Sequence, residues 1–341
     1  MRIGESNRFR GLAVALDGPR VDRLVVSRHG TPVVEVRVDV ASPELASLPG
    51  VSGGASRFEF DLEVDGLAPF DIAVVHEDGA LTPAFVFDAP FAAREAPRLA
   101  RLRDGVSERP APPGRLIAVT QGGENVEAYR DSIVSGLLTS HALLAASGAS
   151  PARDVLDVGC GTGRLLLGWH VEDPARSLVG VDVDGELIGW NRENLPAVAR
   201  WETSGIAPPL DFPDASFDLV QLVSVLTHLP LALQRDWMVE VRRLLRPGGS
   251  ALVTLHGPTY DRLVLGEIDR DAFRRTGYVE MRGGTEGTSA FATFHSPDSA
   301  DELFRGLGRV TRFPRGSAGE GPPSLFPIAS LQDVYVLSDA L

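Results

Sequence analysis

The chain has 341 residues, 43% of them hydrophobic, so it is long enough for two domains and can bury a substantial core. Its 33 basic and 46 acidic residues give a net charge of −13, which argues against a nucleic-acid-binding surface because such a surface needs clustered positive charge. The single cysteine, Cys160, excludes an internal disulfide framework, and the lack of an apolar signal core or of a stretch as long as a membrane span predicts a cytoplasmic protein.

Short apolar runs with period-two alternation fill the chain from residue 9 to about residue 88, for example at 33–38, 58–64 and 71–75. Turn signals such as Asp17-Gly18-Pro19 and Asp65-Gly66 separate these runs. Closely spaced short strands with turns between them are typical of an antiparallel sandwich. We therefore predict a small antiparallel β-sandwich domain over residues 1–90.

A stretch rich in alanine, arginine and proline follows at residues 91–124. We predict a short helix there, followed by a Pro-rich linker in which residues 109–114 form stiff, extended chain. This interval separates the first domain from a second, which we place at residues 125–341.

In the second domain, segments with helical spacing alternate with short apolar strands. The predicted strands are 155–158, 178–181, 217–223 and 251–255, with a late strand near 291–294, and the predicted helices are 165–170, 186–194 and 231–245. This alternation is typical of an α/β fold whose parallel sheet is covered by helices on both faces.

Three alternating glycines come directly after the first of these strands, in DVLDVGCGTGR at 154–164. In an open parallel sheet, ligands bind beyond the carboxyl ends of the strands, where the strand order reverses. Glycines let the backbone approach a ligand there, and the following helix offers free N–H groups to an anionic group. The turn therefore predicts a ligand-binding loop, the alternative being a tight turn that binds nothing.

An acidic residue ends the second strand, in VGVDVD at 179–184. Asp182 is placed to accept hydrogen bonds from the hydroxyls of a ribose, and Asp184 is placed to cap the next helix. A dinucleotide fingerprint would have its third glycine where this chain has Arg164. The pattern therefore counts against a nicotinamide-dependent oxidoreductase, which stays an alternative.

Four motifs together resemble those of class I S-adenosylmethionine-dependent methyltransferases, in the order and at the spacing of that family: VLDVGCGTGR at 155–164, VGVDVD at 179–184, PPLDFPDASFDLVQLVSVLTHL at 208–229 and VRRLLRPGGSALVTLHG at 241–257. The resemblance covers residues 125–341. It implies a Rossmann-like, seven-stranded methyltransferase domain with S-adenosyl-L-methionine as cofactor.

The resemblance also implies which residues hold this cofactor. The methionine end would be held by Asp157 and by the turn of Gly159, Cys160, Gly161, Thr162 and Gly163, while Asp182 would take the ribose hydroxyls. Cys160 is expected to be a small packing residue there rather than a nucleophile.

Further contacts are implied for the adenine and for the reactive end of the cofactor. Val183 would pack on the adenine, whose edge would lie against Ser204, Gly205 and Ile206. Many relatives carry an acid in that segment and this chain has none, so backbone contacts would read the adenine. The other implied contacts are Val223 and Ser224 at the fourth strand and, from an entry helix that could equally be a packing helix, Tyr129 and Gly136.

Three histidines follow strands at the predicted active edge: His228, His256 and His295. Methyl transfer to a hydroxyl requires removal of its proton, and histidine suits this role near neutral pH. His228 and His256 are equal candidates and His295 is the third, while Tyr260 and Arg262 are candidates for substrate contact. No paired acids accompany the histidines, so we predict no metal.

The N-terminal stretches at 10–18 and 42–45 loosely resemble small β domains attached to bacterial glycan-assembly enzymes. This resemblance implies O-methylation of a sugar or of a glycosylated small molecule, with a small-molecule or glycan acceptor and no nucleic acid as partner. Two alternatives stay open: the N-terminal domain only joins copies into a homo-oligomer, or the whole chain is a non-catalytic scaffold with a degenerate methyltransferase fold.

Overall fold

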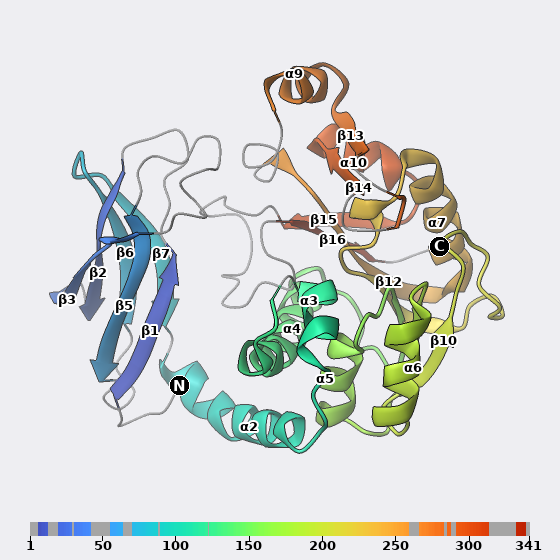
Figure 1. Cartoon of the computed structure of the whole chain (residues 1–341), viewed down its shortest axis with the longest axis horizontal. Coiled ribbons are helices and arrows are strands. Elements are labelled where there is room, and N and C mark those ends of the chain that lie inside the picture. Colours follow the sequence, from blue (N-terminus) through green and yellow to red (C-terminus); the bar gives the residue numbers. More distant parts are fainter. Residues whose placement is uncertain are drawn as a thin grey trace. The chain divides into compact units, whose positions relative to one another are not determined.

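The computed structural model describes residues 6–12, 20–28, 31–41, 55–63, 70–87, 89–121, 123–258, 266–282, 285–287, 291–313 and 332–338 (Figure 1). The chain forms two compact units, one of residues 1–100 with 262–264 and the other of residues 101–261 with 265–341. The turns expected at 17–19 and 65–66, the segment 42–45, and the substrate contacts expected from Tyr260 and Arg262 lie outside the described residues.

The first unit contains two antiparallel sheets. One has the order β1-β5-β4, from strands β1 (Ser6–Leu12), β5 (Ala55–Glu63) and β4 (Val40–Ala41). The other has the order β3-β2-β6-β7, from strands β3 (Thr31–Arg37), β2 (Val21–Arg28), β6 (Phe70–His76) and β7 (Leu81–Phe87). The antiparallel strands predicted for this region are therefore present.

Alternation along these strands builds a shared apolar cluster. Leu24 and Val26, two residues apart on β2, point to the same side and are buried together with Val38 and with Phe60 of β5. Because β2 and β5 belong to different sheets, the cluster joins the inner faces of the two sheets.

Two helices lie in or overlap residues 91–124, for which a short helix and a linker are predicted. Helix α2 (Ala89–Ser107) is longer than predicted, and α3 (Gly114–Gln121) begins directly after the prolines. Leu116 and Ile117 of α3 are buried, and this burial stabilises a helix that its short length alone would not. No helix in the described part of the chain is long and apolar enough to cross a bilayer.

The second unit is built on a seven-stranded sheet with the order β10-β9-β8-β11-β12-β16-β15. Its first five strands are parallel: β10 (Arg200–Thr203), β9 (Ser177–Asp182), β8 (Asp154–Val158), β11 (Phe217–Leu222) and β12 (Leu245–Leu255). Strand β16 (Asp333–Ser338) pairs antiparallel with β12, and β15 (Arg309–Phe313) pairs antiparallel with β16 at the edge of the sheet. The strand order reverses between β8 and β11, which is where open α/β sheets bind their ligands.

The predicted helices of this unit are also present. Helix α4 (Val126–Ala146) packs on α5 (Arg164–Glu172), α5 and α6 (Gly185–Asn194) pack on β9, and α7 (Leu231–Leu244) packs on β11 and β12. A single 3-10 turn, η1, spans Leu226–His228. The seven-stranded, Rossmann-like architecture expected from the motifs is therefore confirmed.

The late strand predicted near 291–294 needs a correction. It is present as β14 (Phe291–His295), but it pairs with β13 (Tyr278–Arg282) in a separate two-stranded antiparallel sheet. Helices α9 (Glu267–Thr276) and α10 (Pro297–Leu303) flank this hairpin. His295 therefore ends a strand outside the main sheet and does not follow one of its strands.

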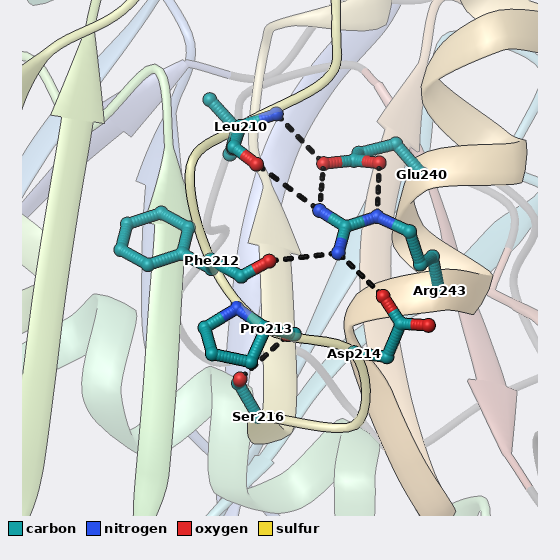
Figure 2. A network of polar contacts seen from close by, with 7 residues as sticks. All are labelled: Leu210, Phe212, Pro213, Asp214, Ser216, Glu240 and Arg243. Carbon is teal, nitrogen blue, oxygen red and sulfur yellow. Dashed lines mark hydrogen bonds and ion pairs between the residues drawn. The ribbon is translucent and has the colours of Figure 1, made fainter.

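Arg243 fastens the loop that joins β10 to β11 (Figure 2). Its guanidinium donates to both carboxylate oxygens of Glu240, at 2.7 and 2.8 Å, and to the carbonyls of Leu210 and Phe212 at 3.1 and 2.7 Å. It also contacts Asp214 Oδ1 at 2.7 Å, and Glu240 accepts the Leu210 N–H at 2.8 Å. Burial raises the pKa of Glu240, but the bonds from Arg243 and Leu210 outweigh it and hold that pKa below its usual value.

Replacing Arg243 by alanine is expected to lower the free energy of unfolding by about 2 kcal/mol, because Glu240, only 4% exposed, loses its charged partner. Urea unfolding measures the loss. Arg242→Ala is the matched control, since that exposed side chain on the same helix makes one 3.4 Å contact with the Gly306 carbonyl and its loss should cost under about 0.5 kcal/mol. Equal losses in the two variants would contradict this role for Arg243.

Candidate active site

The glycine turn lies at the carboxyl end of β8, beside the point where the strand order reverses. Gly159, Gly161 and Gly163 all have positive φ, at 69°, 54° and 73°, a backbone region that side chains with a Cβ rarely adopt. A Cβ at Gly163 would lie 2.5 Å from the ring of Trp201. The turn therefore needs glycine both for its conformation and for its close approach to the neighbouring chain.

Cys160 is buried within this turn. Burial, and then the neighbouring Asp157 and Asp182, raise the pKa of its thiol well above the usual value, so the thiol stays protonated at neutral pH. Its backbone N–H donates to the Val181 carbonyl at 3.0 Å. These contacts agree with a packing residue and with no nucleophilic role.

The two acids that end β8 and β9 lie beside the turn. Asp182 Oδ2 accepts the Gly161 N–H at 2.7 Å, and Asp182 Oδ1 accepts the Asp184 N–H at 2.9 Å. Burial raises the pKa of Asp182, and these two bonds partly offset the rise. A carboxylate offers about four lone pairs, so Asp182 can also accept ribose hydroxyls while it fixes the turn. Asp184 caps α6 by accepting from Glu186 N and Leu187 N, as expected.

Asp157 is 2% exposed, and burial followed by the charge of Asp182 raises its pKa from 3.8 to about 7, against the opposing effects of Arg164 and Gln221. Between about pH 4 and pH 7 the folded state therefore keeps a proton that the unfolded state releases, so the free energy of unfolding falls as pH rises through this window. A buried carboxylate with a raised pKa beside the glycine turn is a candidate functional position.

Asp157→Asn is consequently expected to be more stable than the parent protein in the absence of ligand. Its advantage should grow as pH rises from about 4 to about 7 and then level off, because in this window only the unfolded state of the parent protein is stabilised by releasing the proton of Asp157. Thermal unfolding at several pH values measures this. An advantage that does not change with pH would show that Asp157 does not titrate in the folded state.

Tyr129 and Gly136, the two candidate residues of α4, are buried and contact neighbouring elements. Tyr129, 1% exposed, donates its hydroxyl to the Thr162 carbonyl at 3.3 Å and thereby supports the glycine turn. A Cβ at Gly136 would lie 2.8 Å from Leu165 Cδ2, so glycine there lets α4 approach α5 closely. Both residues therefore make packing contacts, and their contact with the cofactor stays a prediction.

The positions implied for the adenine show exposed apolar side chains. Val183 is 47% exposed and Ile206 is 37% exposed, so both side chains are accessible to a ligand at this edge. Ser204 N–H donates to the Asp182 carbonyl at 2.9 Å, which places the segment 204–206 beside Val183. Gly205 is exposed.

Ser224 follows β11 at the same edge, one residue after the half-buried Val223. It is one of two described residues other than glycine with positive φ, at 58°, and its N–H donates to Thr254 Oγ1 at 2.8 Å. Gln332 Nε2 donates to Ser224 Oγ at 2.8 Å, while Gln332 Oε1 is buried with no partner among the described residues. Leu255 pairs with Asp333, so Gln332 directly precedes the last residue of β16 that pairs with β12.

The structure brings His228 and His256 together, with ring centroids 6.2 Å apart. His228 is half-buried, and its Nδ1–H donates to the Phe291 carbonyl at 2.8 Å, which leaves Nε2 as the lone-pair nitrogen. His256 is 4% exposed, and its Nδ1–H donates to the Thr293 carbonyl at 3.1 Å. Burial, with the charge of His228, lowers the pKa of His256 to about 4, so it is neutral at pH 7.

His295 differs from the other two histidines. Its side chain is fully buried, its Nδ1 contacts Ser299 Oγ at 3.0 Å, and burial lowers its pKa to about 3. It therefore lies inside the β13–β14 hairpin packing. Within the described ranges, no three His, Cys, Asp or Glu side chains are grouped so that they could hold a metal ion.

Sequence reasoning missed Thr120 and Gln332. Thr120 of α3 lies over the glycine turn, since a Cβ at Gly161 would be 2.8 Å from Thr120 Cγ2. Neither residue belongs to a motif, and each reaches the site only through packing or register.

A glycine turn lies at the point of strand reversal, beside acids from two adjacent strands. This arrangement is typical of a nucleotide-cofactor-binding α/β domain.

Comparison with known proteins places this domain in a family. A family model described as a methyltransferase domain matches residues 155–249. An uncharacterized methyltransferase of Synechocystis is 32% identical over 111 residues, covering 32% of this chain and 50% of the relative. A malonyl-[acyl-carrier protein] O-methyltransferase of Geobacter sulfurreducens is 32% identical over 198 residues, covering 57% of this chain and 67% of the relative.

The chain therefore belongs to the S-adenosylmethionine-dependent methyltransferases. It spans about half the length of several curated relatives that it matches, for example 50% and 56%. Among solved structures, the PH0226 protein of Pyrococcus horikoshii matches 63% of this chain and 92% of its own chain, at 18% identity and a TM-score of 0.42.

Proposed function

We propose that the protein transfers a methyl group from S-adenosylmethionine to a hydroxyl of a sugar or of a glycosylated small molecule, with His228 as the general base. The observation that carries the proposal is the tethering of His228 Nδ1–H to the Phe291 carbonyl at 2.8 Å, because it fixes the tautomer in which Nε2 can accept a proton. One curated relative is named as an O-methyltransferase, which supports oxygen as the methyl acceptor.

The residues present fit the cofactor. Thr162 Oγ1 is buried in the glycine turn without a partner among the described residues, so the turn has a hydrogen-bonding group left for a ligand. Asp157 and the turn from Gly159 to Gly163 would hold the methionine end, Asp182 the ribose, and Val183 with Ile206 the adenine. When bound, S-adenosylmethionine supplies an electrophilic methyl group.

His228 Nε2 would take the hydroxyl proton of the acceptor as the new oxygen–carbon bond forms. Positioning of the acceptor supplies much of the rate, and a general base within hydrogen-bond reach adds about 10²–10⁴-fold. His256, whose pKa is about 4, is a poor base near neutral pH, and its ring centroid lies 6.2 Å from that of His228. We therefore assign it to holding the acceptor, and we leave the fully buried His295 without a chemical role.

The proposed acceptor side of the site presents hydrogen-bond acceptors. His228 donates its Nδ1–H to a backbone carbonyl, which leaves its Nε2 to accept, and Gln332 Oε1 has no partner among the described residues. A ligand with several hydroxyl donors complements such a set, which supports a sugar. The loose resemblance of the N-terminal stretches to glycan-assembly domains points the same way, while assembly of copies is the alternative role for that unit.

Calorimetric titration with S-adenosylmethionine and, separately, with NADH tests the cofactor. Micromolar binding of S-adenosylmethionine alone is expected. Incubation with methyl-labelled S-adenosylmethionine and a panel of sugars and glycosides, read by mass spectrometry, then tests the acceptor. Cofactor binding with methyl transfer only to nitrogen or carbon acceptors would overturn the O-methyl proposal, and the absence of cofactor binding would favour the scaffold alternative.

A further inference from the structure

Asn191 occupies an apolar position of α6. It lies on the inward side of the helix with Leu187 and Ile188 and is 0% exposed. Burying an amide among apolar side chains is unfavourable unless hydrogen bonds compensate it. Asn191 Nδ2 donates to the Gly161 carbonyl at 2.8 Å, whereas Asn191 Oδ1 has no partner among the described residues. The side chain therefore stays at this position through a single bond to the glycine turn.

Gly161 is fixed on both sides. Its N–H donates to Asp182 Oδ2 at 2.7 Å, and its carbonyl accepts from Asn191. The peptide between Gly161 and Thr162 is trans and planar, so its N–H points opposite to its carbonyl. Because Asn191 holds the carbonyl toward α6, it directs the Thr162 N–H away from α6.

Thr162 has two hydrogen-bond donors without a partner among the described residues. Its side chain is 1% exposed, and neither its Oγ1 nor its N–H makes a hydrogen bond with any residue that the structure describes. Two unpaired donors on one buried residue, at the N-terminus of α5, complement an anionic group. The anionic group of S-adenosylmethionine is the carboxylate of its methionine end.

We propose that Asn191 is a positioning residue for the methionine end of the cofactor: by holding the Gly161 carbonyl it aims the Thr162 N–H at the cofactor carboxylate. The proposal rests on cofactor binding at the glycine turn. Asn191 acts through the backbone, so its replacement affects ligands that carry the methionine end and spares those that lack it.

Two ligands separate these effects: S-adenosylhomocysteine, which carries the amino-acid end, and 5′-methylthioadenosine, which lacks it. Calorimetric titration of Asn191→Leu is expected to show S-adenosylhomocysteine binding about tenfold more weakly than to the parent protein, with 5′-methylthioadenosine binding unchanged within about twofold. Leucine suits the apolar face of α6, and Asn191→Ala repeats the test in case leucine disturbs the packing.

Asn194→Ala is the matched control, because Asn194 lies on the same helix and donates to the Trp190 carbonyl without touching the turn. It should leave both affinities unchanged. Equal weakening of the two ligands by the Asn191 variants, or no weakening of either, would overturn the positioning role. Failure of the parent protein to bind S-adenosylhomocysteine would instead overturn the proposed function itself, so the two failures are distinguishable.

Discussion

Asp182→Ala is expected to weaken S-adenosylmethionine binding by about 10²–10³-fold. The carboxylate accepts the Gly161 N–H at 2.7 Å and the Asp184 N–H at 2.9 Å, and it is the proposed partner of the ribose hydroxyls. Hydrogen bonds to a charged group contribute about 1.5–3 kcal/mol each, so the loss of two such bonds accounts for an effect of this size. The variant loses both a direct ligand contact and the support of the turn.

The neighbouring acid provides the control. Asp184 caps α6 through Glu186 N and Leu187 N, so Asp184→Ala should cost about 1 kcal/mol of stability and leave cofactor affinity within about threefold of the parent value. Calorimetric dissociation constants and thermal unfolding temperatures of both variants separate the two roles. Similar dissociation constants for the Asp182 and Asp184 variants would refute the role given to Asp182.

The proximity of the glycine turn and Asp182 could be predicted because these residues come from contiguous motifs. A strand followed by alternating glycines fixes the local conformation of the turn, and parallel pairing of β8 with β9 carries Asp182 to the same edge. Both effects depend on residues within about one strand–helix–strand unit, whose handedness is nearly invariant. The sequence pattern alone therefore predicts that the glycine turn and Asp182 lie close together.

The proposed acceptor side could not be predicted in the same way. Gln332 reaches Ser224, 108 residues earlier in the chain, only because β16 is inserted antiparallel beside β12, and no local pattern encodes that register. Asn191 and Thr120 likewise meet Gly161 through helix packing. His295 was misplaced for the same reason, since its strand has the composition of a sheet strand but pairs in a hairpin.

His228→Ala is expected to lower kcat by about 10²–10³-fold, once an acceptor is in hand, while the dissociation constant for S-adenosylmethionine stays within about twofold of the parent value. The imidazole touches the proposed acceptor side and not the glycine turn. Its Nδ1–H bond to the Phe291 carbonyl orients Nε2, so alanine removes a base that is already oriented. His256→Ala should instead raise the KM for the acceptor and lower kcat by less than about tenfold, because His256 is placed to hold the acceptor.

His141→Ala is the control for the loss of an imidazole, since His141 lies on α4 and pairs with Glu172 at 2.7 Å, away from the strand ends that form the site. Steady-state kinetics at saturating cofactor, with calorimetry of cofactor binding, measure all three variants. A change in kcat for His228→Ala alone identifies the base. A larger loss of kcat for His256→Ala would transfer the role to His256, and unchanged kcat in both variants would leave positioning, without general-base catalysis, as the source of the rate.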